Sequence, residues 1–306
     1  MPELPEVQTI VSDLSKVLPG LKIRDVWADF RKMIKHPKTF DGFQKELVGK
    51  KILKIRRRGK NILIDLSGNT TLLIHQKMTG HLLYGKYQKS IRQPADKYQK
   101  WIAIGRGPLK DDPQNRFLHL VISFSNGRRL ALSDLRKFAK VLLWPTDKLD
   151  QLGDIKNIGP EPLEKSFTFE KFKKIFENPP AGQRRGKRGK VHQFLMEQKN
   201  IAGIGNIYSS EILWEAGIHP LKDISKLKET ELKKIYQAVK KVLTKALKAK
   251  GDSTSDYRRP SGEKGGYQNI QQAYQMEGKK CRKNDGGIIQ RIKIGSRSAF
   301  YCSKHQ

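Results

Sequence analysis

The sequence predicts an α+β fold in which strands dominate the first half of the chain and helices dominate the second. Short β-rich runs separated by turn residues fill the first half. Apolar residues spaced three and four positions apart follow in the second half. Between the halves, residues 147–162 are rich in Gly and Pro, which is typical of an interdomain linker. At 306 residues the chain is long enough for two domains, each with its own core.

The first half begins with a predicted helix and continues as an antiparallel sandwich. Apolar side chains recur at helical spacing from Val7 to Leu18 and stop before Pro19 and Gly20, where we expect the helix to end. Strands are expected at residues 22–28, 51–57, 61–66, 70–75, 117–124, 128–132 and 140–144. Residues 125–127, Ser-Asn-Gly, are a hairpin-turn signal. Residues 86–116 are polar and predict a long surface insertion.

The second half is predicted to be helical. Helices are expected at residues 169–176, 192–197, 207–216 and 229–248, and the last has the clearest apolar stripe. A glycine-laced basic loop precedes the second of these helices, with the cations Arg184, Arg185, Lys187, Arg188 and Lys190. A run of charged residues is usually only a solvent-exposed surface without a binding role. Because no acid compensates this one, it favours contact with phosphate.

The charge of the chain restricts its partners. Lys and Arg number 62 against 30 Asp and Glu, giving a net charge of +32 and a pI near 10.1, so a polyanion such as nucleic acid is expected. A membrane surface is disfavoured, because the sequence offers no amphipathic anchor, lipidation signal or long apolar run. The absence of a secretory signal and the presence of only Cys281 and Cys302 predict a cytoplasmic, nucleoid-associated protein.

The first six residues, MPELPE, would place a proline amine beside two carboxylates once Met1 is removed. An α-amino group has a pKa of about 7.7–8, so a useful fraction is uncharged near neutral pH. A secondary amine can condense with an aldehyde-like sugar carbon to an iminium, which acts as an electron sink. On these residues alone the alternative is ordinary helix-start chemistry, with Pro5 in the first turn and Glu3 and Glu6 at the positive end of the helix dipole.

Residues 203–208, GIGNIY, offer a second local signal. Glycines before a helix expose backbone N–H groups to an anion, and Asn206 adds a side-chain donor at the cap position. The alternative is a tight helix turn with an ordinary Asn cap. A dinucleotide-binding loop is disfavoured, because no strand precedes these glycines.

Together these motifs give the chain a specific resemblance. PELPEV at 2–7, RRGK at 57–60, HQKMTG at 75–80, DLRKF at 134–138, the segment 201–220 and a terminal Cys/Cys/His hairpin occur in this order. In this respect the chain resembles the bacterial formamidopyrimidine-DNA glycosylases of the Fpg/Nei family. The matching motifs cover nearly the whole chain.

The resemblance implies a helix-capped N-terminal β-sandwich, a C-terminal helix–two-turn–helix domain, a zinc β-hairpin, and damaged double-stranded DNA in the cleft between the halves. We therefore expect a catalytic domain at residues 1–150, a linker at 151–165, a DNA-binding domain at 166–277 and the hairpin at 278–306. It also implies a bifunctional glycosylase and abasic-site lyase that removes oxidised purines such as 8-oxoguanine. We expect it to act as a monomer.

The resemblance also assigns catalytic roles. Pro2 would attack the sugar C1′ as a Schiff-base nucleophile, and Glu3 would protonate the opening ring. Glu6 would support them by positioning the proline or a water, and Lys60 would hold a flanking phosphate or the damaged base. Elimination at the β and then the δ position would cut the strand.

Further residues would bind DNA. The damaged nucleotide must leave the stack before its C1′ can be reached, and the hole must be filled. Met78, Arg136 and Phe138 match the family's void-filling residues, although Met78 or Phe138 alone could equally be core residues. Other members of the predicted interface are His75, Asn206, Tyr208 and Arg297, together with a loop at 251–266 that would close over an everted base.

The terminal hairpin departs from the family pattern of four cysteines. Cys281, Cys302 and His305 remain, and Asp285 takes the place of the second cysteine, with sixteen residues between it and Cys302. Carboxylate oxygens can bind zinc, so we expect one structural Zn²⁺ held by Cys281, Asp285, Cys302 and His305. Such a site should be weaker than four thiolates. The alternative is a metal-free hairpin held by its own strands.

Other functions were also considered. A related endonuclease VIII type prefers oxidised pyrimidines, but Leu4 stands where that group usually has glycine, and Arg136 and Phe138 favour the purine branch. A non-catalytic DNA-binding protein is disfavoured by the intact Pro2 and Glu3. The alternative of a basic RNA-binding or ribosome-associated protein is supported by the charge alone.

Overall fold

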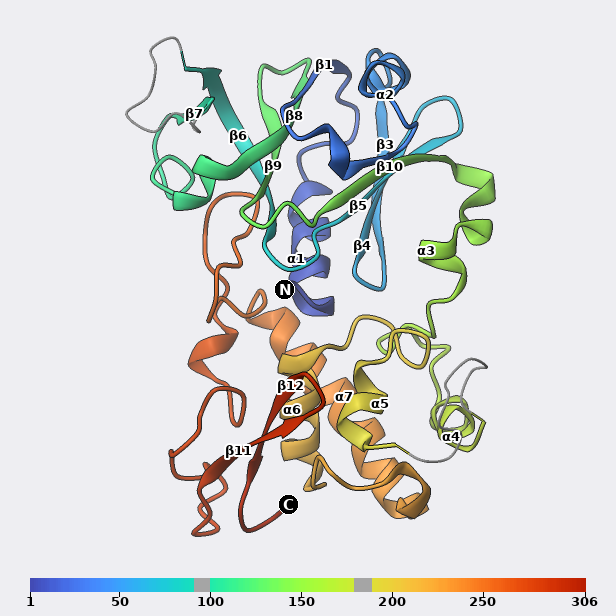
Figure 1. Ribbon diagram of the computed structural model, residues 1–306, viewed down its shortest axis with the longest axis vertical. Coiled ribbons are helices and arrows are strands. Elements are labelled where there is room, and N and C mark those ends of the chain that lie inside the picture. Colours follow the sequence, from blue (N-terminus) through green and yellow to red (C-terminus); the bar gives the residue numbers. More distant parts are fainter. Residues whose placement is uncertain (91–99, 179–188) are drawn as a thin grey trace. The chain divides into compact units, whose positions relative to one another are not determined.

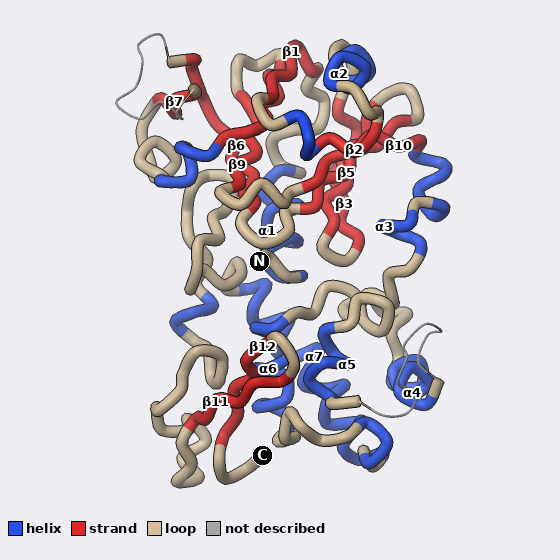
Figure 2. Tube along the Cα trace, in the orientation of Figure 1, coloured by secondary structure: helices blue, strands red, loops and turns tan. Residues whose placement is uncertain are grey.

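The computed structural model describes residues 1–90, 100–178 and 189–306 (Figure 1). Contacts divide the chain into two compact units. Unit 1 contains Met1–Lys156 and Lys250–Gly266, and unit 2 contains Asn157–Ala249 and Tyr267–Gln306. Strands gather in unit 1, and most of the described α-helical residues lie in unit 2 (Figure 2), which confirms the predicted α+β class. None of the described helices has both the length and the apolar character needed to cross a membrane.

Unit 1 is a sandwich of two five-stranded sheets. The first sheet has the spatial order β1 (Ile23–Ala28), β8 (Leu118–Phe124), β9 (Arg129–Asp134), β6 (Gly80–Lys89) and β7 (Trp101–Ile104). The second has the order β2 (Ile34–His36), β10 (Lys140–Pro145), β5 (Thr70–His75), β4 (Asn61–Leu66) and β3 (Ile52–Arg58). Neighbouring strands are antiparallel, except that β2 and β10 are parallel. All seven predicted strands are present within one or two residues of the expected bounds.

Helix α1 (Leu4–Leu14) packs on the core of the sandwich. Its apolar face is buried in one cluster with residues of both sheets, among them Ile64 and Leu120. The helix ends at Leu14, earlier than predicted, although Leu18 remains buried in the turn that follows. Helix α2 (Phe40–Leu47) was not predicted; Thr39 caps it by accepting a hydrogen bond from Gly42 N.

Residues 91–99 of the predicted surface insertion lie outside the described residues, and the described part contains more secondary structure than the sequence indicated. Residues 86–89 of β6 pair with β7, which adds an edge strand to the first sheet. Trp101 and Tyr87 are buried in a small second core with residues of β8 and β9. The short helix η2 (Pro113–Phe117) then leads into β8. Apolar residues at 101–104 therefore anchor a segment whose overall composition is polar.

Short helices complete unit 1 and lead out of it: η1 (Arg31–Met33), η3 (Thr146–Gln151) and α3 (Gly153–Lys156). The Gly- and Pro-rich stretch predicted as a linker contains the boundary between the units at Lys156 and Asn157. Lys250–Gly266 follows the last long helix in sequence but packs with unit 1, because its contacts are with α1 and β6.

Unit 2 is built around helix α6 (Asn206–Ala216), which contacts α7 (Glu229–Lys248) and the strand β12 (Arg297–Cys302). The other elements are α4 (Phe169–Glu177), α5 (Val191–Met196), η4 (Ile224–Lys226), η5 (Tyr267–Asn269) and β11 (Ile289–Ile294). These bounds agree closely with the predicted helices. Of the basic loop, Arg184, Arg185, Lys187 and Arg188 lie outside the described residues.

A buried carboxylate joins α6 to the segment before the hairpin. Glu211 accepts hydrogen bonds from the backbone N–H groups of residues 272–274 and from the Tyr267 hydroxyl, at 2.8–3.1 Å. Burial raises the pKa of Glu211, and these donors oppose that rise. The hairpin of β11 and β12 begins fifteen residues after this anchored segment, at Ile289.

Candidate active site and metal cluster

The first residues of the chain are folded onto unit 1. Glu3 is the N-cap of α1, and its backbone N–H donates to Glu6 Oε2 at 2.8 Å in a capping box. Pro2, Glu3 and Glu6 are buried, whereas Met1 is exposed. Both acids lie at the helix N-terminus, where the dipole favours negative charge. The structure therefore brings the proline and the two carboxylates into one buried turn.

The Glu6 carboxylate is also held by a segment remote in sequence. Asp252 N donates to Glu6 Oε1 at 2.7 Å, and the Tyr257 hydroxyl donates to the Glu6 carbonyl oxygen at 3.4 Å. Gly251 has a φ of +84°, and a Cβ there would lie 2.9 Å from Glu6 Oε1, so a side chain does not fit. Sequence reasoning missed these contacts, because no local pattern links positions 246 residues apart.

Lys60 lies at the turn of the β3–β4 hairpin, next to Gly59, whose φ is +56°. The side chain of Arg57 ties this hairpin to α1: Nε donates to Gln8 Oε1 at 3.0 Å and Nη1 donates to the Gly59 carbonyl at 2.8 Å. Lys60 itself is largely buried. A cation is thus held on a hairpin that is fixed to the helix carrying the two acids.

His75, at the end of β5, is held in its neutral form. Its Nδ1 accepts a hydrogen bond from Lys77 N at 3.0 Å. Burial, followed by the positive charges of Lys77 and Lys60, lowers the pKa of His75 to about 3. The ring is therefore uncharged at physiological pH, and its Nε2–H remains a neutral donor.

Two loops of unit 1 carry the predicted void-filling residues, and a buried acid joins them. Asp134 accepts hydrogen bonds from the Thr79 hydroxyl at 2.6 Å and from Ala139 N at 2.6 Å. Thr79 Oγ1 in turn accepts from Arg136 N at 3.1 Å. The loop with Met78, between β5 and β6, is thereby fixed to the loop between β9 and β10. Sequence reasoning did not identify Thr79 and Asp134 as supporting residues.

Phe138 is exposed, which excludes the alternative that it is a core residue. Its side chain is 52% accessible, and Arg136 stacks its guanidinium 4.7 Å from the ring centroid. Met78 is half-buried. An exposed aromatic ring with a cation stacked on it is suited to contact a base or to enter a base stack.

In unit 2 the structure refines two predicted DNA-binding residues. Gly205, not Asn206, is the N-cap of α6, and Asn206 Nδ2 donates to the Ser298 carbonyl of β12 at 3.0 Å. The ring of Tyr208 is 0% exposed and packs on Tyr267 at 5.3 Å, so that side chain is unavailable to a phosphate. The predicted anion contact at this position therefore rests on the positive end of the α6 dipole and not on the Tyr208 side chain. Arg297 is exposed at the start of β12.

Four potential metal ligands meet beside the β11–β12 hairpin. The donor atoms of Cys281, Asp285, Cys302 and His305 all lie within 4.8 Å of one another. His305 Nδ1 lies 2.5 Å from Asp285 Oδ2, and its Nε2 lies 3.1 Å from the Trp214 carbonyl. If Nε2–H donates to that carbonyl, Nδ1 is left unprotonated and directed at the other three donors, as a metal ligand requires. The residues present therefore fit a tetrahedral metal ion.

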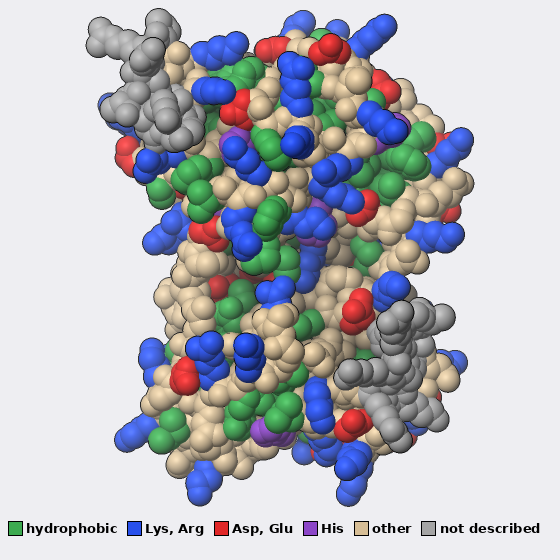
Figure 3. All heavy atoms as spheres, viewed as in Figure 1, with side chains coloured by type: hydrophobic (Ala, Val, Ile, Leu, Met, Phe, Trp, Pro, Cys, Tyr) green, Lys and Arg blue, Asp and Glu red, His purple; other side chains and the backbone are tan. Residues whose placement is uncertain are grey.

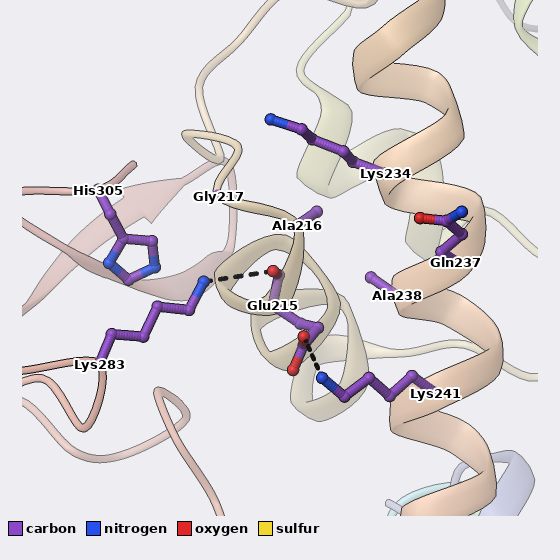
Figure 4. Close-up of a pocket in the computed structure, with 9 residues that line it drawn as sticks. All are labelled: Glu215, Ala216, Gly217, Lys234, Gln237, Ala238, Lys241, Lys283 and His305. Carbon is purple, nitrogen blue, oxygen red and sulfur yellow. Dashed lines mark hydrogen bonds and ion pairs between the residues drawn. The ribbon is translucent and has the colours of Figure 1, made fainter.

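A surface pocket of about 510 Å³ adjoins this cluster, with His305 and Lys283 in its lining (Figure 4). The C-terminal end of α6 fills one side. Lys283 Nζ donates to the carbonyls of Trp214 and Glu215 at 3.2 and 3.3 Å, and Lys241 pairs with the Glu215 carboxylate at 2.6 Å (Figure 4). Two lysines that line the pocket thus bind acceptors of α6 and stabilise the C-terminal end of that helix.

The visible surface of each unit is rich in Lys and Arg side chains, and Asp and Glu are fewer (Figure 3). With a net charge of +32, both units are expected to attract a polyanion.

Comparisons with known proteins agree with this geometry. The Formamidopyrimidine-DNA glycosylase N-terminal domain family matches residues 1–141, and the Formamidopyrimidine-DNA glycosylase H2TH domain family matches residues 158–258. A formamidopyrimidine-DNA glycosylase of Pelotomaculum thermopropionicum is 37% identical over 302 residues, which cover 99% of this chain and 98% of the relative. One from Pediococcus pentosaceus is 34% identical with the same coverage.

Solved structures give the same result. A Lactococcus lactis protein of this kind, in complex with DNA containing an abasic site, has a TM-score of 0.81 and 31% identity, covering 99% of both chains. A mutant of that protein with DNA containing Fapy-dG has a TM-score of 0.82 and 32% identity, covering 100% of this chain and 99% of the other.

The exposure of Phe138 gives a first testable prediction. Phe138→Ala should change the free energy of unfolding by less than about 0.5 kcal/mol, because surface substitutions rarely do more. Phe124→Ala, at a buried position of β8, is the matched control and should cost about 3–5 kcal/mol. Urea unfolding measures both values, and a comparable loss in the two variants would mean that Phe138 is a packing residue.

Proposed function

The chain belongs to the formamidopyrimidine-DNA glycosylase family, and on this premise we propose that it excises oxidised purines through Pro2 and then cuts the abasic strand. Family membership makes it a DNA glycosylase of base excision repair. The proposal concerns the nucleophile, the damaged base and the lyase steps. The observation that carries it is the buried turn in which Pro2 precedes Glu3 and Glu6.

The chemistry requires a free proline amine, so Met1 must first be removed. The Pro2 nitrogen attacks the sugar C1′, and the bond from C1′ to the damaged base breaks as that base leaves with its electron pair. The attacking nitrogen loses its N–H proton to solvent, Glu3 donates a proton to the ring oxygen as the sugar opens, and an iminium forms between Pro2 and C1′. The iminium acidifies the C2′ proton. Loss of that proton drives elimination of the 3′ phosphate and then of the 5′ phosphate.

The hydrogen bonds of Glu6 favour a positioning role for this acid. Each Glu6 carboxylate oxygen accepts a hydrogen bond from a backbone N–H, one from Glu3 and one from Asp252. A carboxylate held in this way suits positioning of the helix N-terminus. Proton donation is assigned to Glu3, which directly follows Pro2 and is buried in the same turn.

DNA binding is assigned to residues of both units. Met78, Arg136 and Phe138 would fill the space left by the extruded nucleotide, supported by the exposed Phe138 ring and the fixed loops. Phosphates would be held by Lys60, by the neutral His75 Nε2–H and by the first turn of α6. Arg297 would add a phosphate contact from the hairpin.

We assign one zinc ion to Cys281, Asp285, Cys302 and His305, supported by their convergence within 4.8 Å. When bound, zinc contributes structural stability to the hairpin and no step of the reaction. The carboxylate of Asp285 makes this donor set harder than a set of thiolates. Zinc should therefore be held less tightly than by four cysteines.

The assignment of Pro2 predicts a covalent adduct. Protein whose mass shows that Met1 is absent should crosslink to DNA containing 8-oxoguanine or an abasic site when borohydride is added, because borohydride reduces the iminium. Glu3→Gln should lower the rate of base excision at least 100-fold with little change in duplex affinity.

An uncleaved N-terminal extension is the matched control, since it leaves the fold but blocks the amine. The proposal fails if the extended protein crosslinks as well as the native one, or if protein beginning at Pro2 does not crosslink at all.

The void-filling role predicts a difference between two substrates. Met78→Ala, Arg136→Ala and Phe138→Ala should each slow excision of 8-oxoguanine from a duplex about tenfold or more. Cleavage of a preformed abasic site should fall less than about threefold, because extrusion of that site is already easy. Leu135→Ala, at an exposed neighbour in the same loop, is the control and should affect neither rate. Equal slowing of both substrates would contradict the role.

The metal assignment predicts about one zinc per chain in protein purified without chelator. Cys302→Ser should abolish zinc binding and weaken duplex affinity, and Asp285→Asn should weaken zinc binding less severely. Borohydride crosslinking to an abasic site at saturating protein should persist in both variants. Elemental analysis that finds no zinc in the native protein, with unchanged duplex affinity in Cys302→Ser, would overturn the assignment.

A further inference from the structure

The segment Lys250–Gly266 connects the insertion after β6 with the acids at the start of α1. One end of the segment binds Glu6 through Asp252 N. The other end packs against Pro108, Leu109 and Asp112 of the insertion. Family membership assigns no role to this second contact; the role proposed for it rests on the proposed function of the N-terminal turn.

Shape complementarity fixes the segment against the insertion. Pro260 O accepts a hydrogen bond from Tyr84 N of β6 at 2.7 Å. A Cβ on Gly262 would lie 2.6 Å from both N and Cα of Leu109, so the two backbones are in direct contact. The side chain of Leu109 fills the space above Gly85, where a Cβ would meet its Cδ2 at 2.2 Å. Glycine is thus required at position 262, which faces backbone and has a φ of +85°, whereas a side chain at position 85 would displace the Leu109 side chain.

A buried ion pair accompanies this contact. Asp112 Oδ2 lies 3.6 Å from Arg258 Nε, and the Asp112 side chain is 1% exposed. Its other oxygen, Oδ1, accepts a hydrogen bond from Gln114 N at 2.9 Å and so caps helix η2. A buried carboxylate needs compensating charge, and Arg258 supplies it. The pair therefore ties the position of Arg258 to the insertion.

The residues next to Arg258 in sequence connect the segment to α1 and to the core of the sandwich. Arg259 binds the Asp13 carboxylate through two hydrogen bonds, at 2.8 and 3.1 Å. Tyr257 is buried in the core of the sandwich. Between Tyr257 and Asp252, Thr254 and Ser255 are exposed. The exposed tip of the segment is thus held between an anchor at Glu6 and an anchor at the insertion.

We propose that Asp112 is a positioning residue for base excision, acting through Arg258 to hold residues 252–262 in place. The insertion thereby serves as the receptor for the segment that orients Glu6 and presents its exposed tip to the extruded base. Excision of a damaged base should depend on this restraint. Cleavage of a preformed abasic site should depend on it less, because no base remains to be contacted.

Asp112→Asn tests the proposal with little change in shape, because the Asn Oδ1 can still accept from Gln114 N. We expect the rate of 8-oxoguanine excision to fall about tenfold and abasic-site cleavage less than twofold. Hydrogen exchange of the peptide spanning 250–266 should become at least tenfold faster, while exchange in β11 and β12 stays unchanged.

Asp29→Asn is the matched control. Asp29 pairs with His119 of β8 at 2.8 Å and with Lys100 of the insertion at 3.4 Å, so Asp29→Asn neutralises an acid whose ion-pair partners lie outside residues 250–266. This variant should leave both the exchange of 250–266 and the ratio of the two rates unchanged.

The outcomes separate this inference from the proposed function. Unchanged exchange of 250–266 in Asp112→Asn overturns the anchor, and faster exchange with an unchanged ratio of rates overturns the positioning role. An equal effect of Asp29→Asn would also overturn the positioning role of Asp112, because a general loss of rigidity in unit 1 would then explain the slower excision. Failure of the native protein to form a borohydride crosslink would instead contradict the Pro2 mechanism, and the exchange measurement would still decide whether the anchor exists.

Discussion

The buried carboxylate of Glu6 is the interaction on which the arrangement of unit 1 depends. A charge removed from water must be compensated by hydrogen bonds. Here Glu3 N supplies one donor from the start of the chain and Asp252 N supplies the other from a segment 246 residues away. The N-terminus must therefore stay folded on α1, and residues 250–266 must pack with unit 1. The same two hydrogen bonds place Pro2 and residues 252–262, the segment proposed to contact the base, beside Glu6.

Much of the sandwich could be predicted, because its strands differ clearly from the turns between them. The strands of the sandwich that the sequence did not predict are β2, β6 and β7, and β6 and β7 do not differ clearly from their surroundings. β6 contains Gly80 and Gly85 and is buried on both faces over its first six residues, so it shows no alternation of polar and apolar positions. β7 has only four residues within a polar stretch. Its place in the sheet depends on Trp101 packing with Tyr87, a contact that no pattern in either segment indicates.

The candidate site could be predicted where its residues are neighbours in sequence, as at 2–6 and 134–138. Orientation could not be predicted. Helix α6 is buried on nearly all sides, so no apolar stripe shows that Tyr208 faces the core. Asn206 resembles a cap in sequence, but Gly205 takes that position and frees the Asn side chain to bind β12. Supporting contacts such as Thr79 with Asp134 depend on the fold that brings separate loops together.

Contacts elsewhere in the hairpin allow a carboxylate, Asp285, to stand among its candidate metal ligands. The strands β11 and β12 pair along their whole length, and Glu211 anchors the preceding segment through three backbone N–H groups. Asn206 fixes β12 at Ser298, next to Arg297. These contacts position the hairpin at the end that carries Arg297, whereas the four ligands meet at the opposite end of its strands. The proposed zinc site can therefore be weak, because the residue proposed to reach DNA is also positioned by helix α6.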